Sequence, residues 1–120
     1  MAELADTLDD LALLIARAEK SVDGRTFEEL VANDEAYDAL TYRLAMIGET
    51  SKRLPDALKS RHPDLPWREM ATFRNFASHD YFGVDARLVW QAAMSLRPIK
   101  VMVVEEAARC RNEESRDGGL

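Results

Sequence analysis

The sequence predicts an all-α protein that folds as a four- to five-helix up-and-down bundle. Apolar residues recur in steps of three and four along several segments, which is the spacing of one face of a helix. Runs in which apolar β-branched residues alternate with polar ones, typical of strands, are absent. Glycine and proline are scarce, at 5 and 4 of 120 residues, and 47% of the chain is hydrophobic, which is enough for a single core.

The first half of the chain predicts two long helices with a short one between them. The first long helix stops near Gly24, and Thr26 with Glu29 forms a capping-box pattern that opens a short helical turn. Asn33 or Asp34 can cap the second long helix. The apolar stripe of the first long helix comprises Leu4, Leu8, Leu11, Ile15, Ala18 and Val22, and that of the second comprises Tyr37, Leu40, Leu44, Ile47, Ser51 and Leu54.

The second half predicts a short helix at 56–61, a helix that begins after Pro66, and a last long helix capped by Asp85. The segment 78–84 is expected to be a helix end or a tight bend. Pro98 predicts a kink or a break in the last helix, because its ring clashes with the preceding turn and it has no N–H to donate.

Composition indicates a single domain over 1–110 and a polar, disordered tail over 111–120. Cys110 is the one cysteine, so no intrachain disulfide can form, and the N-terminus lacks the pattern of a signal peptide. No apolar run approaches the roughly 20 residues of a membrane span. These features predict a cytoplasmic protein without membrane contact.

The net charge of −6 means that any contact with RNA must come from a local basic patch, because phosphate binding usually needs a cationic surface. The candidates for such a patch cluster in the sequence before the most unusual segment of the chain. They are Lys52, Arg53, Lys59, Arg61 and Arg68.

That unusual segment is Phe73 to Tyr81, with the sequence Phe-Arg-Asn-Phe-Ala-Ser-His-Asp-Tyr. Positions i and i+5 of a regular helix differ by about 500°, which leaves them roughly 140° apart around the axis. Arg74 and His79 therefore converge on one point only if the helix ends between them, or if two chains each contribute a pair.

These residue types suit the cleavage of an RNA phosphodiester. A histidine, with an ordinary pKa of about 6.5, can take the proton of the ribose 2′-hydroxyl or give one to the leaving 5′-oxygen. The guanidinium of an arginine grips phosphate oxygens and keeps its charge. Asn75 can orient the phosphate and Asp80 can select the imidazole tautomer, and this chemistry needs no metal.

The pattern Arg74-Asn75-x-x-x-His79-x-Tyr81 resembles the R-x4-H-x-Y signature of the HepT-like HEPN toxins. Further likeness lies in the flanks, at Ile47-Gly48-Glu49, at His62-Pro63 with Leu65-Pro66-Trp67, and at Val84-Asp85 with Trp90. It runs from Tyr37 to Ile99.

The resemblance implies a HEPN-like bundle that forms a symmetric homodimer, with two Arg-His pairs in one cleft. It implies a metal-independent ribonuclease without a cofactor, acting on mRNA or tRNA as the toxin of a toxin–antitoxin pair. Arg74 and His79 would be the catalytic residues. The partner would be a MntA-type nucleotidyltransferase antitoxin that transfers AMP to Tyr81, which adds charge and bulk beside His79.

Other interpretations stay open from the sequence. On spacing alone, Arg74 and His79 more often form a structural salt bridge and a hydrogen-bonded histidine. The chain could be a non-catalytic HEPN binding subunit of a nucleotidyltransferase complex, or an acidic helical dimerisation protein without chemistry. Trp67 and Trp90 are expected to anchor a core or an interface, and His62 is expected to be a solvated loop residue.

Overall fold

The chain is all-α, as predicted. The computed structural model describes residues 2–79 and 85–118, and for residues 2, 74–79, 117 and 118 it describes the backbone alone. Within these ranges there is no strand, and the helices are α1 (Ala2–Val22), α2 (Phe27–Ala32), α3 (Asp34–Ser51), α4 (Asp56–Arg61), α5 (Trp67–His79), α6 (Ala86–Met94) and α7 (Leu96–Gly118).

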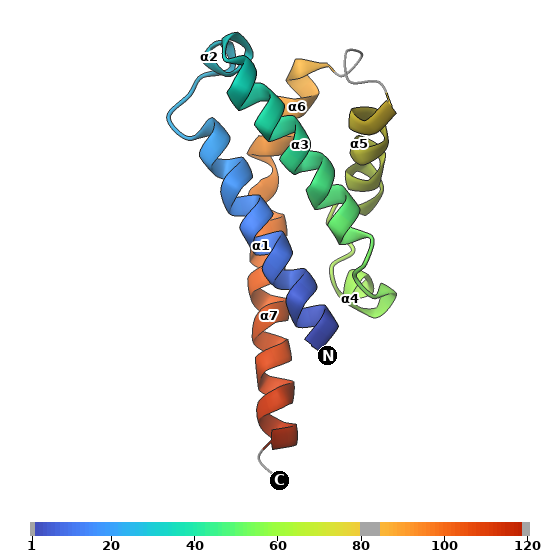
Figure 1. Cartoon of the computed structure of the whole chain (residues 1–120). Coiled ribbons are helices and arrows are strands. Elements are labelled where there is room, and N and C mark those ends of the chain that lie inside the picture. Colours follow the sequence, from blue (N-terminus) through green and yellow to red (C-terminus); the bar gives the residue numbers. More distant parts are fainter. Residues whose placement is uncertain (1, 80–84, 119–120) are drawn as a thin grey trace.

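The long helices form an up-and-down bundle in which α3 lies between α1 and α5, while α1 runs along α7 (Figure 1). Short helices α2 and α4 cover opposite ends of the bundle. The last turns of α7 extend past the other helices, so the molecule is elongated, with extents of 56 × 27 × 21 Å. Four helix termini lie at the same end of the bundle, namely the end of α1, the start of α3, the end of α5 and the start of α6.

The predicted start and stop signals of the helices are confirmed. Gly24 follows α1 with a φ of +71°, a conformation that side chains with a Cβ rarely adopt. The hydroxyl of Thr26 accepts a hydrogen bond from the Glu29 backbone N–H at 3.1 Å and completes a capping box for α2. Asn33 caps α3 by accepting from the Ala36 N–H at 3.1 Å, and Asp85 caps α6 by accepting from the Arg87 N–H at 2.8 Å.

The predicted break in the last long helix is confirmed between α6 and α7, at Ser95. A continuous helix would place the ring of Pro98 against the carbonyl of Met94, four residues earlier. The chain instead ends α6 at Met94 and restarts at Leu96. Pro98 is therefore the third residue of α7, where an N–H has no partner within the helix.

The polar segment that begins at Arg111 is helical as far as Gly118, although its composition predicts a disordered tail. Arginine and glutamate are good helix formers, and they supply four of the eight residues from Arg111 to Gly118. Its described side chains are almost all exposed, so it contributes little to the core.

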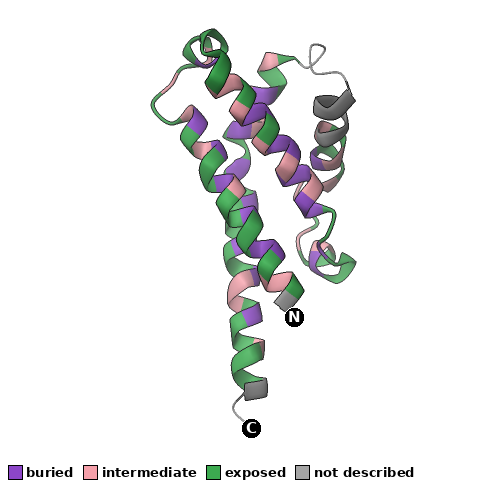
Figure 2. Ribbon diagram, in the orientation of Figure 1, coloured by how far each residue is buried: buried purple, intermediate pink, exposed green. Residues whose placement is uncertain are grey.

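The core lies along the inward faces of the long helices, where buried residues form continuous stripes (Figure 2). Its largest fully buried side chains are Leu8, Leu11, Ile15, Leu30, Leu40, Leu58, Val89 and Met102. Among the described residues, no helix has the length and apolar character needed to cross a membrane.

Candidate functional site

The candidate catalytic residues Arg74 and His79 both belong to α5, which is helical from Trp67 through His79. The helix does not end between them, so the first of the two conditions for their convergence within one chain is not met. Asp80 and Tyr81 lie outside the described residues, as do the side chains of Arg74, Asn75 and His79. The structure thus places three of the candidate residues on one helix and describes no contact between their side chains.

The start of α5 is fixed by Trp67. Its indole Nε1–H donates to the carbonyl of His62 at 2.9 Å, and the ammonium of Lys59 lies 5.9 Å from the centre of its ring. Farther along α5, Met70 is buried and Phe73 packs against the core. Trp67 is thus a core anchor, as predicted, and it holds the helix that carries the motif.

The loop before Trp67 is tied to α7 by the carboxylate of Glu106, whose side chain is only 4% exposed. Arg61 binds both oxygens, with Nη2–Oε1 at 2.7 Å and Nε–Oε2 at 3.2 Å. The Nε2 of His62 lies 2.7 Å from Oε2. The hydrogen bonds from Arg61 lower the pKa of Glu106, against the opposing effect of burial, so the carboxylate stays ionised.

The expectation that His62 is a solvated loop residue is wrong. Its side chain is 15% exposed and faces α7, because Glu106 offers it a buried acceptor. Sequence reasoning also missed Glu106. The available signal was its register: Ile99, Val103, Glu106 and Cys110 follow one another in steps of three and four and are all buried.

Three of the five residues of the predicted basic patch make contacts within the protein, which reduces the positive charge that the patch can offer to RNA. Arg61 is bound to Glu106, Lys59 lies over the Trp67 ring, and the ammonium of Lys52 is 3.9 Å from a Glu49 oxygen. Arg53 and Arg68 are exposed. Arg61 in particular is a structural residue, and it is not available to bind a phosphate with its full set of donors.

An apolar groove of about 490 Å³ lies beside the motif helix. It is lined by Met70 and Phe73 of α5, by Leu44 and Ile47 of α3, and by residues of α6 and α7. Leu88 on its rim is 55% exposed although it is a large apolar side chain. The groove reaches Phe73, the residue directly before Arg74.

Cys110 is buried on α7, and burial is the main cause that raises the pKa of its thiol. A thiol held in its neutral form is a poor nucleophile. Cys110 is therefore unsuited to act as a catalytic nucleophile.

Comparison with known proteins identifies the family. The "Ribonuclease HepT-like" family matches residues 11–105, which include Arg74, His79 and Tyr81. A protein of Thermococcus cleftensis that is named as a probable ribonuclease HepT is 40% identical over 86 residues, which cover 72% of this chain and 78% of the relative.

A second relative, provisionally named as an RNase, comes from Caldanaerobacter subterraneus subsp. tengcongensis. It is 34% identical over 95 residues, 79% of this chain and 81% of the relative. No solved structure matches the chain. The matches confirm the resemblance seen in the sequence, and the chain belongs to the HepT-like ribonuclease family and is an enzyme of the endoribonuclease class.

Proposed function

We propose that this chain is the toxin of a toxin–antitoxin pair and that it cuts mRNA or tRNA without a metal, using Arg74 and His79. The observation that carries the proposal is that the family match spans one continuous helix, α5, on which Arg74, Asn75 and His79 all lie. The same helix borders an apolar groove on the surface.

In the proposed reaction an imidazole takes the proton of a ribose 2′-hydroxyl. The 2′-oxygen then forms a bond to the adjacent phosphorus, and the bond from phosphorus to the 5′-oxygen breaks. An imidazolium returns a proton to that oxygen, so the products carry a 2′,3′-cyclic phosphate and a 5′-hydroxyl. Positioned acid–base catalysis of this kind typically contributes about 10²–10⁴ in rate, and Arg74 stabilises the charge on the phosphorane. Asn75 and Asp80 orient the phosphate and the imidazole.

We further propose that the active form is a symmetric homodimer. Because α5 continues through His79, one chain leaves Arg74 and His79 on different sides of a helix, about 140° apart. A second copy can bring another Arg-His pair to the same cleft. The apolar groove beside Phe73, with the exposed Leu88, gives that copy a surface to bury.

The proposed partner is a MntA-type nucleotidyltransferase that transfers AMP to Tyr81, and the proposed compartment is the cytoplasm. An AMP group two residues from His79 would place a negative charge and a bulky group where an RNA phosphate must bind. Loss of the Tyr81 hydroxyl, in Tyr81→Phe, should therefore leave cleavage intact and make the toxin resistant to its partner.

The test is RNA cleavage by His79→Ala and Arg74→Ala, with Arg116→Ala as the control that removes an exposed arginine on α7, outside the motif and the basic patch. Both motif variants should lose cleavage while their helical circular dichroism stays unchanged, and the control should keep its activity. Chelation with EDTA should have no effect, and the wild-type products should end in a 2′,3′-cyclic phosphate. Full cleavage by His79→Ala, or loss of cleavage on chelation, contradicts the mechanism. A stable nucleotidyltransferase complex without any cleavage would indicate a binding subunit instead.

A further inference from the structure

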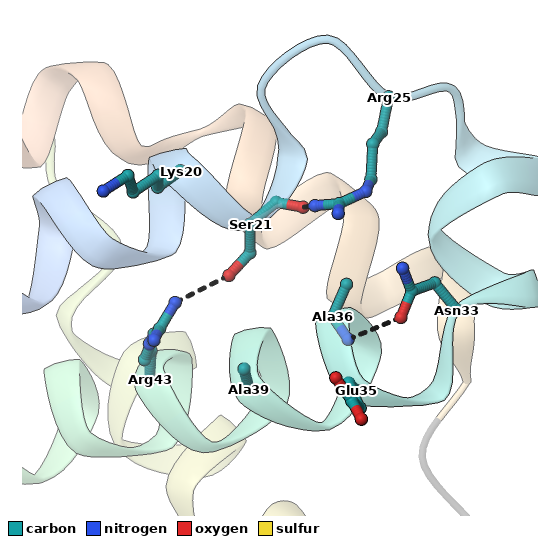
Figure 3. A pocket seen from close by; sticks show the side chains of 8 residues that line it. All are labelled: Lys20, Ser21, Arg25, Asn33, Glu35, Ala36, Ala39 and Arg43. Atoms are coloured by element: carbon teal, nitrogen blue, oxygen red, sulfur yellow. Dashed lines mark hydrogen bonds between the residues drawn. The ribbon is translucent and has the colours of Figure 1, made fainter.

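A second surface feature lies at the end of the bundle where α5 terminates, between the last turn of α1 and the first turns of α3. It is a polar cavity of about 280 Å³, shown in Figure 3. Its lining consists of Lys20, Ser21, Arg25, Asn33, Glu35, Ala36, Ala39 and Arg43. None of these residues belongs to the motif or to the basic patch predicted from the sequence.

The cavity is cationic on a protein that is acidic overall. Three cationic side chains line it, against the single carboxylate of Glu35, while the net charge of the chain is −6. Within the described ranges, Lys20, Arg25 and Arg43 form no ion pair with a carboxylate. Their three positive charges exceed the single negative charge of Glu35 in the lining, which favours binding of an anion.

Both guanidinium groups of the lining are held in place by neutral oxygen atoms. Arg43 donates from Nη1 to the Arg17 carbonyl at 2.8 Å and to the Ser21 hydroxyl at 2.9 Å. Arg25 donates from Nη1 to the Ser21 carbonyl at 2.7 Å. Each group keeps further N–H donors, and a planar guanidinium fixed in this way suits the paired oxygens of a phosphate.

We propose that this cavity binds a backbone phosphate of the RNA strand whose cleavage is proposed above, and the inference rests on that proposed function. Among the residues that the structure describes, no aromatic side chain lines the cavity, so the lining offers no platform on which a base could stack. Contacts to phosphate alone position a nucleic acid and carry no sequence information. The cavity would therefore hold RNA of any sequence.

The position of the cavity fits a strand that continues from the motif. α3 starts and α5 ends at the same end of the bundle, and α3 separates the cavity from α5 (Figure 1). A strand that occupies both places has to cross one helix, which is about 10–12 Å wide with its side chains. A long RNA can reach across this distance, and a dinucleotide bound at the motif cannot.

The test uses the double variant Lys20→Gln/Arg25→Gln in the full-length protein. Arg43 is left intact because its contacts join α3 to α1. The control is Arg111→Gln/Arg116→Gln, which makes the same change in charge at exposed positions of α7. For a long single-stranded RNA, the test variant should raise KM about tenfold at low salt with kcat unchanged, since two phosphate contacts are lost.

The Lys20→Gln/Arg25→Gln change should also flatten the dependence of log affinity on log salt, by about 0.7 for each lost contact. This RNA binding is measured with His79→Ala present in every protein, so that no cleavage occurs. With His79 intact, the double variant should cleave a dinucleotide as fast as the wild type does. If the long-RNA KM and the salt slope equal those of the control, the inference is overturned while the proposed function stands. If wild-type protein cuts no RNA, the proposed function fails, and the binding data on His79→Ala still decide whether the cavity holds a strand.

Inorganic phosphate distinguishes a small anion from an RNA strand as the ligand. Phosphate that perturbs the amide NMR signals of the cavity, together with an unchanged KM for long RNA in the test variant, would assign the cavity to a free anion and overturn the RNA assignment. The expected result is that phosphate competes with long RNA in the wild type and competes less well in the test variant.

Discussion

At the scale of single residues, Glu106 decides how the loop before α5 is held, because its ionised carboxylate is buried against Arg61 and His62. Replacing Arg61 with alanine would leave that carboxylate with less compensation. We expect Arg61→Ala to lower the free energy of unfolding by about 2 kcal/mol, less than for a fully buried pair because Arg61 is partly hydrated. Urea denaturation measures the loss.

Arg109 supplies the matched control for this experiment. Its Nε lies 3.7 Å from the same carboxylate, but its side chain is 53% exposed. Arg109→Ala should change the unfolding free energy by no more than about 0.5 kcal/mol, as surface substitutions usually do. Equal losses of unfolding free energy for the two variants would show that the contact of Arg61 with Glu106 stabilises the fold no more than the contact of Arg109 does.

The lowered pKa of Glu106 also makes a prediction about acid. The hydrogen bonds from Arg61 are the largest cause of the shift, and they lower the pKa of Glu106 below the ordinary value of 4.5. Between the folded and unfolded pKa values the unfolded chain binds more protons, so stability rises with pH there. The contribution is complete above the unfolded value and is lost as pH falls through the folded one. The stability difference between wild type and Glu106→Gln, measured by urea denaturation, should therefore shrink below about pH 4.

The sequence reveals Arg74 and His79 as candidates because their spacing and types form a recognisable pattern. It does not reveal the roles of His62, Glu106 or Arg43. Each of these residues contacts a partner far away in the chain. Glu106 contacts His62 and Arg61, and Arg43 contacts Ser21. Contacts of that kind are set by how helices pack, and local patterns carry little information about them.

At the scale of helices, the prediction was most accurate where the signal is local. Thr26, Asn33 and Asp85 cap helices as the sequence indicates, since a cap depends on a side chain and an N–H two or three residues away. Pro98 likewise predicts the break at Ser95, because its clash reaches only one turn back. The helical course of α7 to Gly118 was not predicted, since polarity argued for a tail while helix propensity argued for a helix.

Asn33 allows a direct test of a cap. Its Oδ1 accepts from the Ala36 N–H at the start of α3, so Asn33→Ala should cost about 1 kcal/mol of stability. Asn112→Ala is the matched control, because Asn112 lies exposed inside α7 and alanine has the higher helix propensity. Thermal denaturation should show a lower Tm for Asn33→Ala, and Asn112→Ala should not lower the Tm. A loss in Asn112→Ala as large as that in Asn33→Ala would contradict the role of the cap.

At the scale of the whole molecule, the order and direction of the long helices follow from short connections between amphipathic segments, and the sequence predicts them. The apolar groove beside α5 and the cationic cavity beside α3 do not follow from any one segment. Each is lined by residues from separate helices. The proposed dimer depends on the first of these features, so it can be tested through the groove.

Leu88→Glu should produce a monomer, because it places a charge on the rim of the apolar groove that we propose the second copy covers. Val104→Glu is the control, since Val104 is 61% exposed on α7 and does not line the groove. Light scattering after size-exclusion chromatography gives the mass of each. A dimeric Leu88→Glu protein would place the interface elsewhere.

Mixing two inactive variants tests whether the cleft is shared. Arg74→Ala retains His79 and His79→Ala retains Arg74, so a dimer with one subunit of each has one arginine and one histidine in a shared cleft. If the residues act across subunits, a mixture that is unfolded and refolded together should recover a measurable part of the cleavage activity, while each variant refolded alone stays inactive. If Arg74 and His79 act only within their own chain, no mixture can restore a complete pair. Recovery should also disappear when both variants carry Leu88→Glu, because the subunits then no longer meet.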